Sequence, residues 1–235
     1  MVRWEPPASG EPLGPLGHRG EVEIRQRGRT FIVTAMFLSL FATSASGAGG
    51  TGGISLSAGL TPIGNGDAGS GSGAPTYNDA YDTGWTGRIE PYYDINPLVR
   101  GQVGVAYNQW GGKTFSSVQF EDLKVLTYYV GVKYRFRPNF NIRPYIVGDI
   151  GAAHIYGVRI FLPGVPGAQS QYWNNSTTVF FDLGGGVEFY IAPKVSCFLD
   201  IRAQWTGVPS SAHPPNSDSN GIDGFPITAG VNFTF

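Results

Sequence analysis

The sequence ends with the stretch FPITAGVNFTF (225–235), in which apolar residues alternate with small or polar ones up to the last position. A period of two is typical of a β-strand that has one apolar face. Chain ends usually fray, so a soluble domain rarely places an aromatic strand at its last residue. A membrane barrel has a reason to do so, because its last strand must pair with its first to leave no open edge in lipid. The stretch therefore indicates a transmembrane β-barrel.

The composition agrees with a protein that exposes much of its surface to lipid. Of 235 residues, 14% are charged, well below the ~25% of soluble domains, and 14% are aromatic. The 35 glycines are about twice the usual share. The net charge of −1 gives no electrostatic reason to expect a nucleic-acid partner. Cys197 is the only cysteine, which excludes an intramolecular disulfide and a cysteine-based metal site, and we expect no cofactor.

Residues 1–47 are expected to form a leader and signal peptide that is cleaved, and residues 48–235 an outer-membrane barrel domain. Three arginines between positions 25 and 29 precede the apolar run FIVTAMFLSLFA (31–42), and small residues follow it. This order is that of a secretory signal. The alternative is an inner-membrane anchor, but the run of 12 residues is shorter than the ~20 that cross a bilayer as a helix.

Eight segments of the mature chain alternate in the same way, and most reach the ~9–11 residues that a tilted strand needs to cross the hydrocarbon. The segments are 54–61, 84–93, 98–107, 124–136, 142–154, 178–191, 196–206 and 225–235.

The connections between these segments alternate between short and long. Short turns rich in Pro and Asn are expected at 94–97, 137–141 and 192–195, and longer loops at 62–83, 108–123, 155–177 and 207–224. Outer-membrane barrels have long outer loops and short periplasmic turns, whereas a soluble β-sandwich does not demand this alternation. The sequence therefore predicts an all-β fold, an eight-stranded antiparallel up-and-down transmembrane β-barrel.

Charged residues occupy the alternate strand positions whose side chains face away from lipid. Because an outward charge at the bilayer midplane costs ~2–4 kcal/mol, we expect them to line the lumen as a network of six basic and five acidic groups that neutralise one another. The expected members are Arg88, Glu90, Arg100, Lys133, Arg135, Arg143, Asp149, Asp182, Glu188, Asp200 and Arg202. Only Lys124 falls on the outward parity.

Aromatic residues on the outward parity gather near the strand ends, where amphipathic rings meet the lipid headgroups. The expected girdle is Trp85, Tyr93, Tyr107, Tyr134, Phe136, Phe189 and Trp205. Val231, Phe233 and Phe235 form the expected signature of the last strand. Inward aromatics such as Tyr129 and Phe198 are expected to fill the lumen against glycines.

Several motifs carry a chemical alternative that the surrounding sequence weakens. GNGDAG (64–69) satisfies the dinucleotide pattern, but Ser, Gly, Ala and Pro follow where a helix is needed, so we interpret it as a flexible surface loop. NSDSNG (216–221) resembles the start of a calcium loop, but its twelfth position is Ile227 instead of Glu. A solvated turn is the favoured interpretation there.

Two further features bear on activity. His154, expected at the outer end of a strand, could serve an enzyme that acts on envelope lipids, but no serine or acid adjoins it, and His213 lies in a Pro-rich loop. Tyr172 and Trp173 in the third long loop could form an exposed contact patch or fold onto the barrel rim, and the sequence does not separate these alternatives.

The chain resembles the small outer-membrane β-barrels of the OmpA/OmpX class. The resemblance rests on the export segment, the strand pattern, RPYIVGDIGAA (143–153), FDLGGGVEFYIAPKVSCFLDIRAQW (181–205) and the terminal VNFTF. It implies a lumen sealed by salt bridges, variable surface loops and no enzymatic site. Proteins of the OmpA type often carry a soluble peptidoglycan-binding domain after the barrel, and this sequence does not continue into one, so that anchoring role is not expected.

The expected protein is a monomer in the outer membrane of a Gram-negative bacterium, with a structural or surface-interaction role, adhesion or masking, through four long loops. The alternatives are a narrow passive porin and, third, an envelope-lipid-modifying enzyme. Expected partners are outer-membrane lipids and lipopolysaccharide, the barrel-assembly machinery through the C-terminal strand, and a surface ligand of the loops.

Overall fold

The computed structural model describes residues 50–69, 73–136, 140–162, 164, 167–212 and 220–235. The predicted leader and signal peptide, residues 216–219 of the calcium-like stretch at 216–221, and His213 lie outside the described residues.

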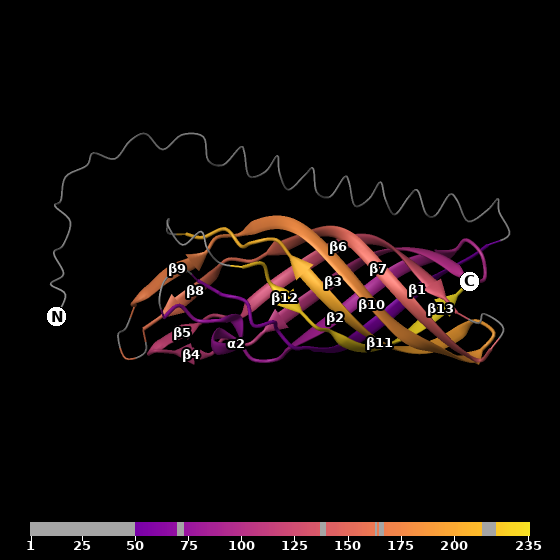
Figure 1. The fold of residues 1–235 in the computed structure, drawn as a ribbon, viewed down its shortest axis with the longest axis horizontal. Helices are drawn as coiled ribbons and strands as arrows, with labels where there is room; N and C mark the ends of the chain where they lie inside the picture. Colours follow the sequence, from indigo (N-terminus) through magenta and orange to yellow (C-terminus); the bar gives the residue numbers. More distant parts are fainter. Residues whose placement is uncertain (1–49, 70–72, 137–139, 163, 165–166, 213–219) are drawn as a thin grey trace, which may run out of the picture. The chain divides into compact units, whose positions relative to one another are not determined.

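Eight long antiparallel strands form a closed ring, as the sequence predicts (Figure 1). The strands are β1 (Thr51–Thr61), β2 (Gly84–Asp94), β3 (Val99–Trp110), β6 (Leu123–Arg135), β7 (Ile142–Ile155), β10 (Ser176–Ala192), β11 (Val195–Thr206) and β13 (Ile227–Thr234). Each strand pairs with its neighbour in the chain, and β13 pairs with β1 to close the ring. The ring leaves no free edge in the membrane region, which is what a spanning β-structure requires.

The seam between the last and first strands has a regular register. It runs from Gly53 opposite Thr234 to Leu60 opposite Ile227. The last strand is shorter than predicted, since Phe225 lies before it, and the short strand β12 (Asp223–Gly224) pairs with β11 instead. Pro226 has no amide hydrogen to donate to the ladder, which explains a strand start at the next residue.

The two faces of the wall differ as the alternation predicts. Outward residues such as Ile89, Val130 and Leu183 are exposed and apolar, whereas their chain neighbours Arg88 and Asp182 are buried. A one-residue shift would exchange the two faces, so this pattern fixes the register of each strand.

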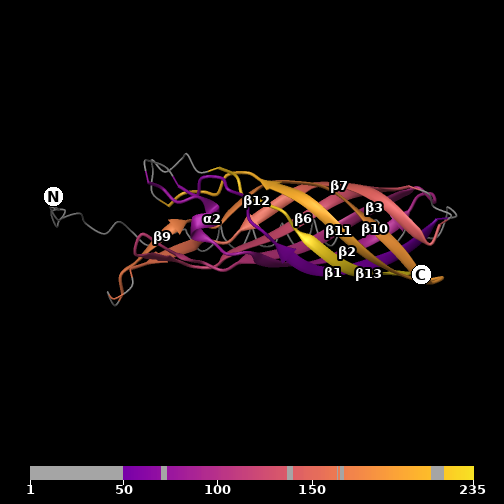
Figure 2. The same cartoon turned by 60° about the horizontal axis from the view of Figure 1, so that its bottom comes forward.

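The long loops are not the free connections that the sequence suggests. Parts of them form a second, four-stranded sheet from β4 (Thr114–Phe115), β5 (Val118–Phe120), β8 (Val158–Phe161) and β9 (Gln169–Trp173). The short helix α2 (Tyr77–Ala80) lies at the same end of the barrel, opposite the C-terminus (Figures 1 and 2). Helices in the described part of the chain are all too short or too polar to cross a bilayer. We refer to these loop-derived elements together as the loop cap.

Candidate functional site: the lumen and its loop cap

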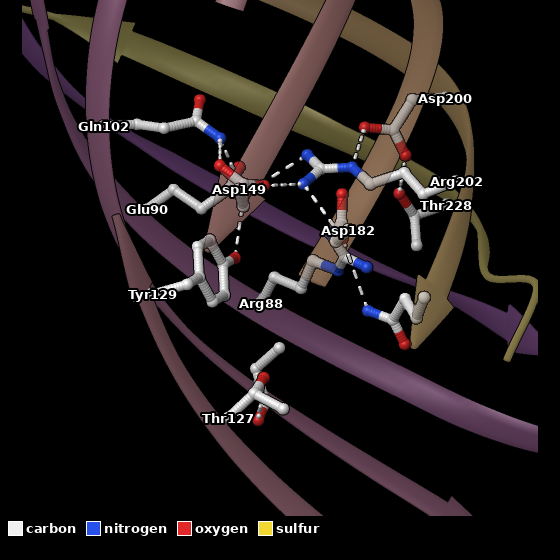
Figure 3. A network of polar contacts seen from close by, with 12 residues as sticks. Arg88, Glu90, Gln102, Thr127, Tyr129, Asp149, Asp182, Asp200, Arg202 and Thr228 are labelled. Atoms are coloured by element: carbon white, nitrogen blue, oxygen red, sulfur yellow. Dashed lines mark hydrogen bonds and ion pairs between the residues drawn. The ribbon is translucent and has the colours of Figure 1, made fainter. Parts of the chain in front are cut away.

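Arg202 on β11 is the centre of the lumen network (Figure 3). Its Nη1 lies 2.7 Å from Asp149 Oδ2 and 3.5 Å from Asp182 Oδ2. Its Nε donates to Asp200 Oδ2 at 2.9 Å, and its Nη2 lies 3.2 Å from Glu90 Oε1. Four strands thus direct carboxylates at one guanidinium group, which is the side chain best suited to several simultaneous charge-assisted hydrogen bonds.

Neutral side chains complete this cluster. Tyr129 donates its hydroxyl to Glu90 Oε1 at 2.8 Å, and Gln102 donates to Asp149 Oδ1 at 2.9 Å. Thr228 donates to Asp200. Because buried charges are costly without hydrogen bonds, these partners help to stabilise the carboxylates. We call Arg88, Glu90, Asp149, Asp182, Asp200 and Arg202 the centre cluster.

A second cluster lies toward the short turns and is organised by Asp94, the last residue of β2. Arg100 binds both of its carboxylate oxygens, at 2.7 and 3.2 Å, and Arg135 Nη2 lies 2.6 Å from Oδ1. The guanidinium carbon of Arg100 also lies 3.4 Å from the centroid of the Tyr92 ring, a cation–π contact.

Glu188 and Lys133 join this second cluster. Glu188 Oε1 accepts from Asn232 at 2.9 Å and from Ser196, and it lies 4.0 Å from Arg100 Nη2. The Lys133 ammonium has no carboxylate within 4.0 Å among the described residues and lies 4.3 Å from the centroid of the Tyr145 ring. We call Asp94, Arg100, Lys133, Arg135, Arg143 and Glu188 the turn-end cluster.

The lumen charges are separated along the barrel axis. The prediction of six basic and five acidic groups gives nearly equal totals and does not describe this separation. The centre cluster holds two guanidinium groups and four carboxylates, a formal charge of −2. The turn-end cluster holds four cations and two carboxylates, a formal charge of +2. Ten of the eleven predicted members are buried, while Arg143 is partly exposed at the turn end.

Glycines make room for the large side chains that cross the lumen. A methyl group at Gly131 would overlap the Asp149 carboxylate, and one at Gly230 would overlap the Phe198 ring. These close approaches explain why bulky and small inward residues face one another in an eight-stranded barrel.

Above the charged clusters, the loop half of the lumen combines an aromatic, apolar core with uncharged polar side chains such as Asn108 and Thr127. Trp173 of β9 is only 2% exposed and stacks on Tyr81 with ring centroids 6.2 Å apart. Tyr77 lies 5.7 Å from Trp173, and Phe120 packs edge-on against Tyr81 at 5.9 Å. The same core continues down to the inward residues at the strand ends, which include Ala106, Trp110, Leu123, Val125, Ala153, Ile155 and Phe180. The loops and the barrel therefore share one hydrophobic core.

Hydrogen bonds tie separate loops together inside this core. The Tyr77 hydroxyl donates to the carbonyl of Asn220 at 2.9 Å, and the Tyr172 hydroxyl donates to that of Ala68 at 3.0 Å. Burial raises the pKa of Tyr77 well above its usual range, so the hydroxyl remains a donor. Trp110 donates its indole N–H to the carbonyl of Thr61 at 2.8 Å.

A capping box fixes the start of α2. Asp79 donates its backbone N–H to Thr76 Oγ1 at 3.3 Å, and Thr76 returns its own N–H to Asp79 Oδ2 at 3.0 Å. The hydrogen bonds from Thr76 lower the pKa of the exposed Asp79 carboxyl. Such reciprocal bonds satisfy two amides that a helix start leaves free.

One interpretation of the loops needs correction, and one choice that the sequence leaves open is decided by the structure. The segment 64–69 is not a free surface loop, because Ala68 is fully buried and donates its N–H to the carbonyl of Pro75 at 3.0 Å. A helix does follow it, but only as the four residues of α2. Of the two alternatives for the third loop, Trp173 folds inward and is not an exposed contact patch.

The predicted girdle residues lie near both ends of the outer wall. Trp85 packs against Tyr107 near the loops, with centroids 5.4 Å apart, and Tyr134 against Phe136 near the turns, at 5.1 Å. Trp205 on β11 lies at the loop end. At the turn end, Phe189 is exposed on β10, and Tyr93 lies near the end of β2. In the C-terminal signature, Val231 is partly exposed, Phe233 is exposed in β13, and Phe235 follows the strand with 76% exposure.

His154 lies on the outer face near the loops. Its Nδ1 lies 3.0 Å from Thr177 Oγ1, and its ring packs edge-on against Tyr156 at 4.9 Å. Its recorded polar partner is thus a threonine, and no ion pair joins it to an acid in the described part of the chain. The described residues contain no group of three His, Cys, Asp or Glu side chains that could hold a metal ion.

Sequence reasoning missed the residues that complete the network. The Pro- and Asn-rich pattern places Asp94 in a turn, although its parity on β2 is that of Glu90 and Tyr92, which would have placed it inside. Gln102 and Asn232 also share the inward parity but carry no charge, so a search for charges passes over them. Considering every polar residue on the inward face of a strand, and not only the charged ones, would have identified all three.

The sequence matches the family described as outer membrane protein beta-barrel domain over residues 31–235. The chain belongs to this family. Its place is accordingly the outer membrane of a Gram-negative bacterium. No curated protein gives a significant sequence match.

Solved outer-membrane barrels resemble the fold. A major outer membrane protein from Thermus thermophilus is 11% identical over 78% of this chain and 99% of that chain, with a TM-score of 0.51. Neisserial surface protein A is 18% identical over 80% and 99%, with a TM-score of 0.49. Ail, the attachment invasion locus protein of Yersinia pestis, is 16% identical over 78% and 99%, with a TM-score of 0.47. At these identities the likeness concerns the fold alone.

Proposed function

We propose that this outer-membrane barrel has a closed lumen and acts through its loop cap, as a surface for adhesion or masking. The observation that carries the proposal is the shared core of the loops and barrel, centred on Trp173, Tyr77 and Tyr81. Loops that only connected strands would have no reason to bury aromatic residues together. A packed cap holds one shape, and a preorganised surface loses less entropy when it binds a partner.

Three successive layers support a closed lumen. From the loops inward they are the apolar core, the centre cluster around Arg202, and the turn-end cluster around Asp94. An ion entering from outside would have to displace well-packed aromatics and then break ion pairs. The barrel should therefore conduct poorly.

Conductance of the refolded barrel in planar bilayers tests the closed lumen. We expect rare, small openings for the wild type and more frequent ones for Glu188→Ala. This substitution removes the acceptor for Asn232 and Ser196 and the carboxylate that lies 4.0 Å from Arg100. A large, steady conductance of the wild type would reject the closed lumen and favour the porin alternative.

The narrow pore is the second candidate because the lumen has buried polar side-chain atoms without a hydrogen-bond partner among the described residues. These include the hydroxyls of Ser55, Ser57 and Thr86 and the Nε of Arg88, all on β1 and β2. Buried polar groups of this kind usually bind water. A hydrated track along these two strands would carry small ions if the apolar core opened.

Adhesion is tested by replacing residues 111–122 and 156–175 with short Gly-Ser turns. These segments supply all four strands of the loop sheet, whereas the eight barrel strands keep their own pairing. We expect cells that express the shortened protein to lose attachment to a host-cell or abiotic surface while the barrel still resists unfolding in cold detergent. Unchanged attachment would show that the loop cap is not the adhesive surface.

We further propose that the protein is no enzyme, because the polar contact of His154 is with Thr177 and no acid pairs with it among the described residues. It acts as a monomer among outer-membrane lipids and lipopolysaccharide. Residues 1–47 serve as leader and export signal.

The last strand, with Phe233 and the protruding Phe235, is the signal for the barrel-assembly machinery. Deleting Phe235 should slow assembly in cells more than refolding in detergent, and equal effects on both would argue against that role.

A further inference from the structure

A hollow of ≈ 290 Å³ lies at the turn end of the barrel, the end that faces the periplasm in proteins of this architecture. Two arginines line it, Arg135 and Arg143, together with Asp94 and Tyr190. Ile95 and Pro193 give it an apolar side. The hollow thus combines cationic groups with an apolar wall, the usual composition of a site for a small anionic molecule.

Arg143 is held in a fixed position at the edge of this hollow. Its guanidinium carbon lies 3.9 Å from the centroid of the Tyr190 ring, and its Nε donates to the carbonyl of Phe140 at 3.1 Å. Neither contact neutralises its charge. Its terminal nitrogens have no recorded hydrogen bond or ion pair within the described residues, although Glu188 lies directly opposite on the next strand.

Arg135 supplies a second cation from inside the barrel. It is 2% exposed, donates to Asp94 at 2.6 Å and approaches the Tyr190 hydroxyl at 3.5 Å. Its Nε is buried without a partner among the described residues. An unpaired donor on a buried cation is costly, and a ligand oxygen would relieve that cost.

Among the described residues, the two carboxylates of the turn-end cluster do not compensate its four cations. Asp94 is shared with Arg100, which occupies both of its oxygens. The turn-end cluster as a whole keeps a formal charge of +2, and the compensating excess of carboxylates lies deeper in the lumen. The excess of positive charge therefore lies at the mouth of the barrel and not at the centre of the lumen.

We propose that this hollow binds a carboxylate group that arrives from the periplasmic side. A planar carboxylate matches the fork of a guanidinium group with two parallel hydrogen bonds. The volume is at the lower end of the ~300–1,000 Å³ of drug-sized sites, so it suits a small carboxylic acid or the carboxyl end of a peptide. The apolar side at Ile95 and Pro193 would contact the carbon skeleton of the ligand.

The test is a titration of the refolded protein in detergent, followed by NMR of its labelled arginine side chains at constant ionic strength. The probes are succinate, acetyl-dialanine, the amide of that peptide, and inorganic phosphate. We expect saturable shifts of the Arg143 and Arg135 Nε–H signals with a Kd of about millimolar for the carboxylates. The amide should produce no saturable shift. Succinate and the peptide distinguish a free acid from a chain end as the source of the carboxylate.

The variants separate a built site from general charge attraction. Arg143→Gln should weaken binding about tenfold, the loss of one charge-assisted hydrogen bond. Tyr190→Leu keeps the charge but removes the ring that orients it, and should also weaken binding. Lys194→Gln removes one charge from an exposed residue in the adjacent turn and should change binding by less than about twofold. Because Arg143 is partly exposed, its variant should fold.

Three results would overturn the proposal. One is a set of linear shifts without saturation for every carboxylate. Another is equal weakening by Arg143→Gln and Lys194→Gln, which would indicate non-specific attraction. The third is saturable binding of phosphate alone, which would reject the assignment to carboxylates. The proposal does not depend on adhesion or conductance, so those functions and this site can fail separately.

Discussion

Replacing Arg202 with methionine should destabilise the barrel strongly. Methionine keeps a long side chain but removes all four contacts to Glu90, Asp149, Asp182 and Asp200. Breaking a buried ion pair from one side costs ~3–5 kcal/mol, because the partner charge stays buried. Here the centre cluster would keep four carboxylates and a single arginine. We therefore expect a loss of about 3–5 kcal/mol in the free energy of unfolding.

The assay is a urea titration of the refolded protein in phospholipid vesicles, followed by tryptophan fluorescence. A surface pair provides the matched control. Arg159 on β8 lies 4.0 Å from Glu121, and 53% and 37% of the two side chains are exposed. Such a pair contributes at most ~1 kcal/mol, so Arg159→Met should leave the unfolding midpoint almost unchanged.

A second variant tests the charge argument directly. Asp149→Asn removes one carboxylate, the one closest to Arg202 at 2.7 Å, and keeps a similar shape. Combined with Arg202→Met, it should recover part of the loss, with a coupling free energy of ~0.5–3 kcal/mol. The reasoning is refuted if Arg202→Met costs less than ~1 kcal/mol, or if the two substitutions are additive.

The lipid face, the loop cap and the export segment each give a further prediction. Val130→Arg, on the lipid face at mid-strand, should lower the free energy of unfolding in vesicles by ~2–4 kcal/mol. A variant as stable as the wild type would show that the assigned strand register is wrong. Thr127→Arg, on the lumen face, should instead act through crowding, visible as altered conductance. Trp173→Ala should lower the free energy of unfolding by ~3–5 kcal/mol and expose the loop cap to protease while the membrane strands stay protected. A loop cap that still resists protease would contradict the shared core. N-terminal sequencing of outer-membrane material should find a start at Ser46 or Ala48, and intact upstream residues there would reject cleavage.

The strands were predictable because their side-chain period is imposed by the environment. One face meets lipid, so residues such as Val130 and Leu183 must be apolar, and the next residue must face the lumen. The predicted limits differ from the observed ones at the strand ends. At the loop end, β10 begins at Ser176, and β3 extends to Trp110, which is buried in the core shared with the loop cap.

The loop sheet was not predictable in the same way. Its strands are two to five residues long, too short for a period to be recognised. The pairing of β5 with β8 joins segments about 40 positions apart, and only the closed ring below brings them together. The turn between β4 and β5 even places Ser116 and Ser117 at positive φ, where glycine or asparagine would be the expected signal. A single sequence therefore shows the loops only as polar and aromatic gaps between strands.

The separation of lumen charges was also beyond the sequence. Counting the inward-facing charges gives nearly equal numbers of basic and acidic groups. The position of each charge along the barrel axis, however, depends on the stagger between neighbouring strands. Asp182 lies opposite Asp149 on the adjacent strand. The two carboxylates are tolerable side by side because Arg202 contacts both of them and Arg88 contacts Asp182.

The seam between β1 and β13 has a consequence for how the barrel forms. Its pairs join residues at opposite ends of the domain, such as Gly53 and Thr234. Contacts of such long range contribute to a high contact order, which slows folding. Until the seam closes, both edge strands carry unpaired amides that lipid cannot satisfy. A half-built ring is thus unstable in the bilayer, and insertion must be concerted. Loss of the first or last strand should therefore abolish the barrel instead of shortening it.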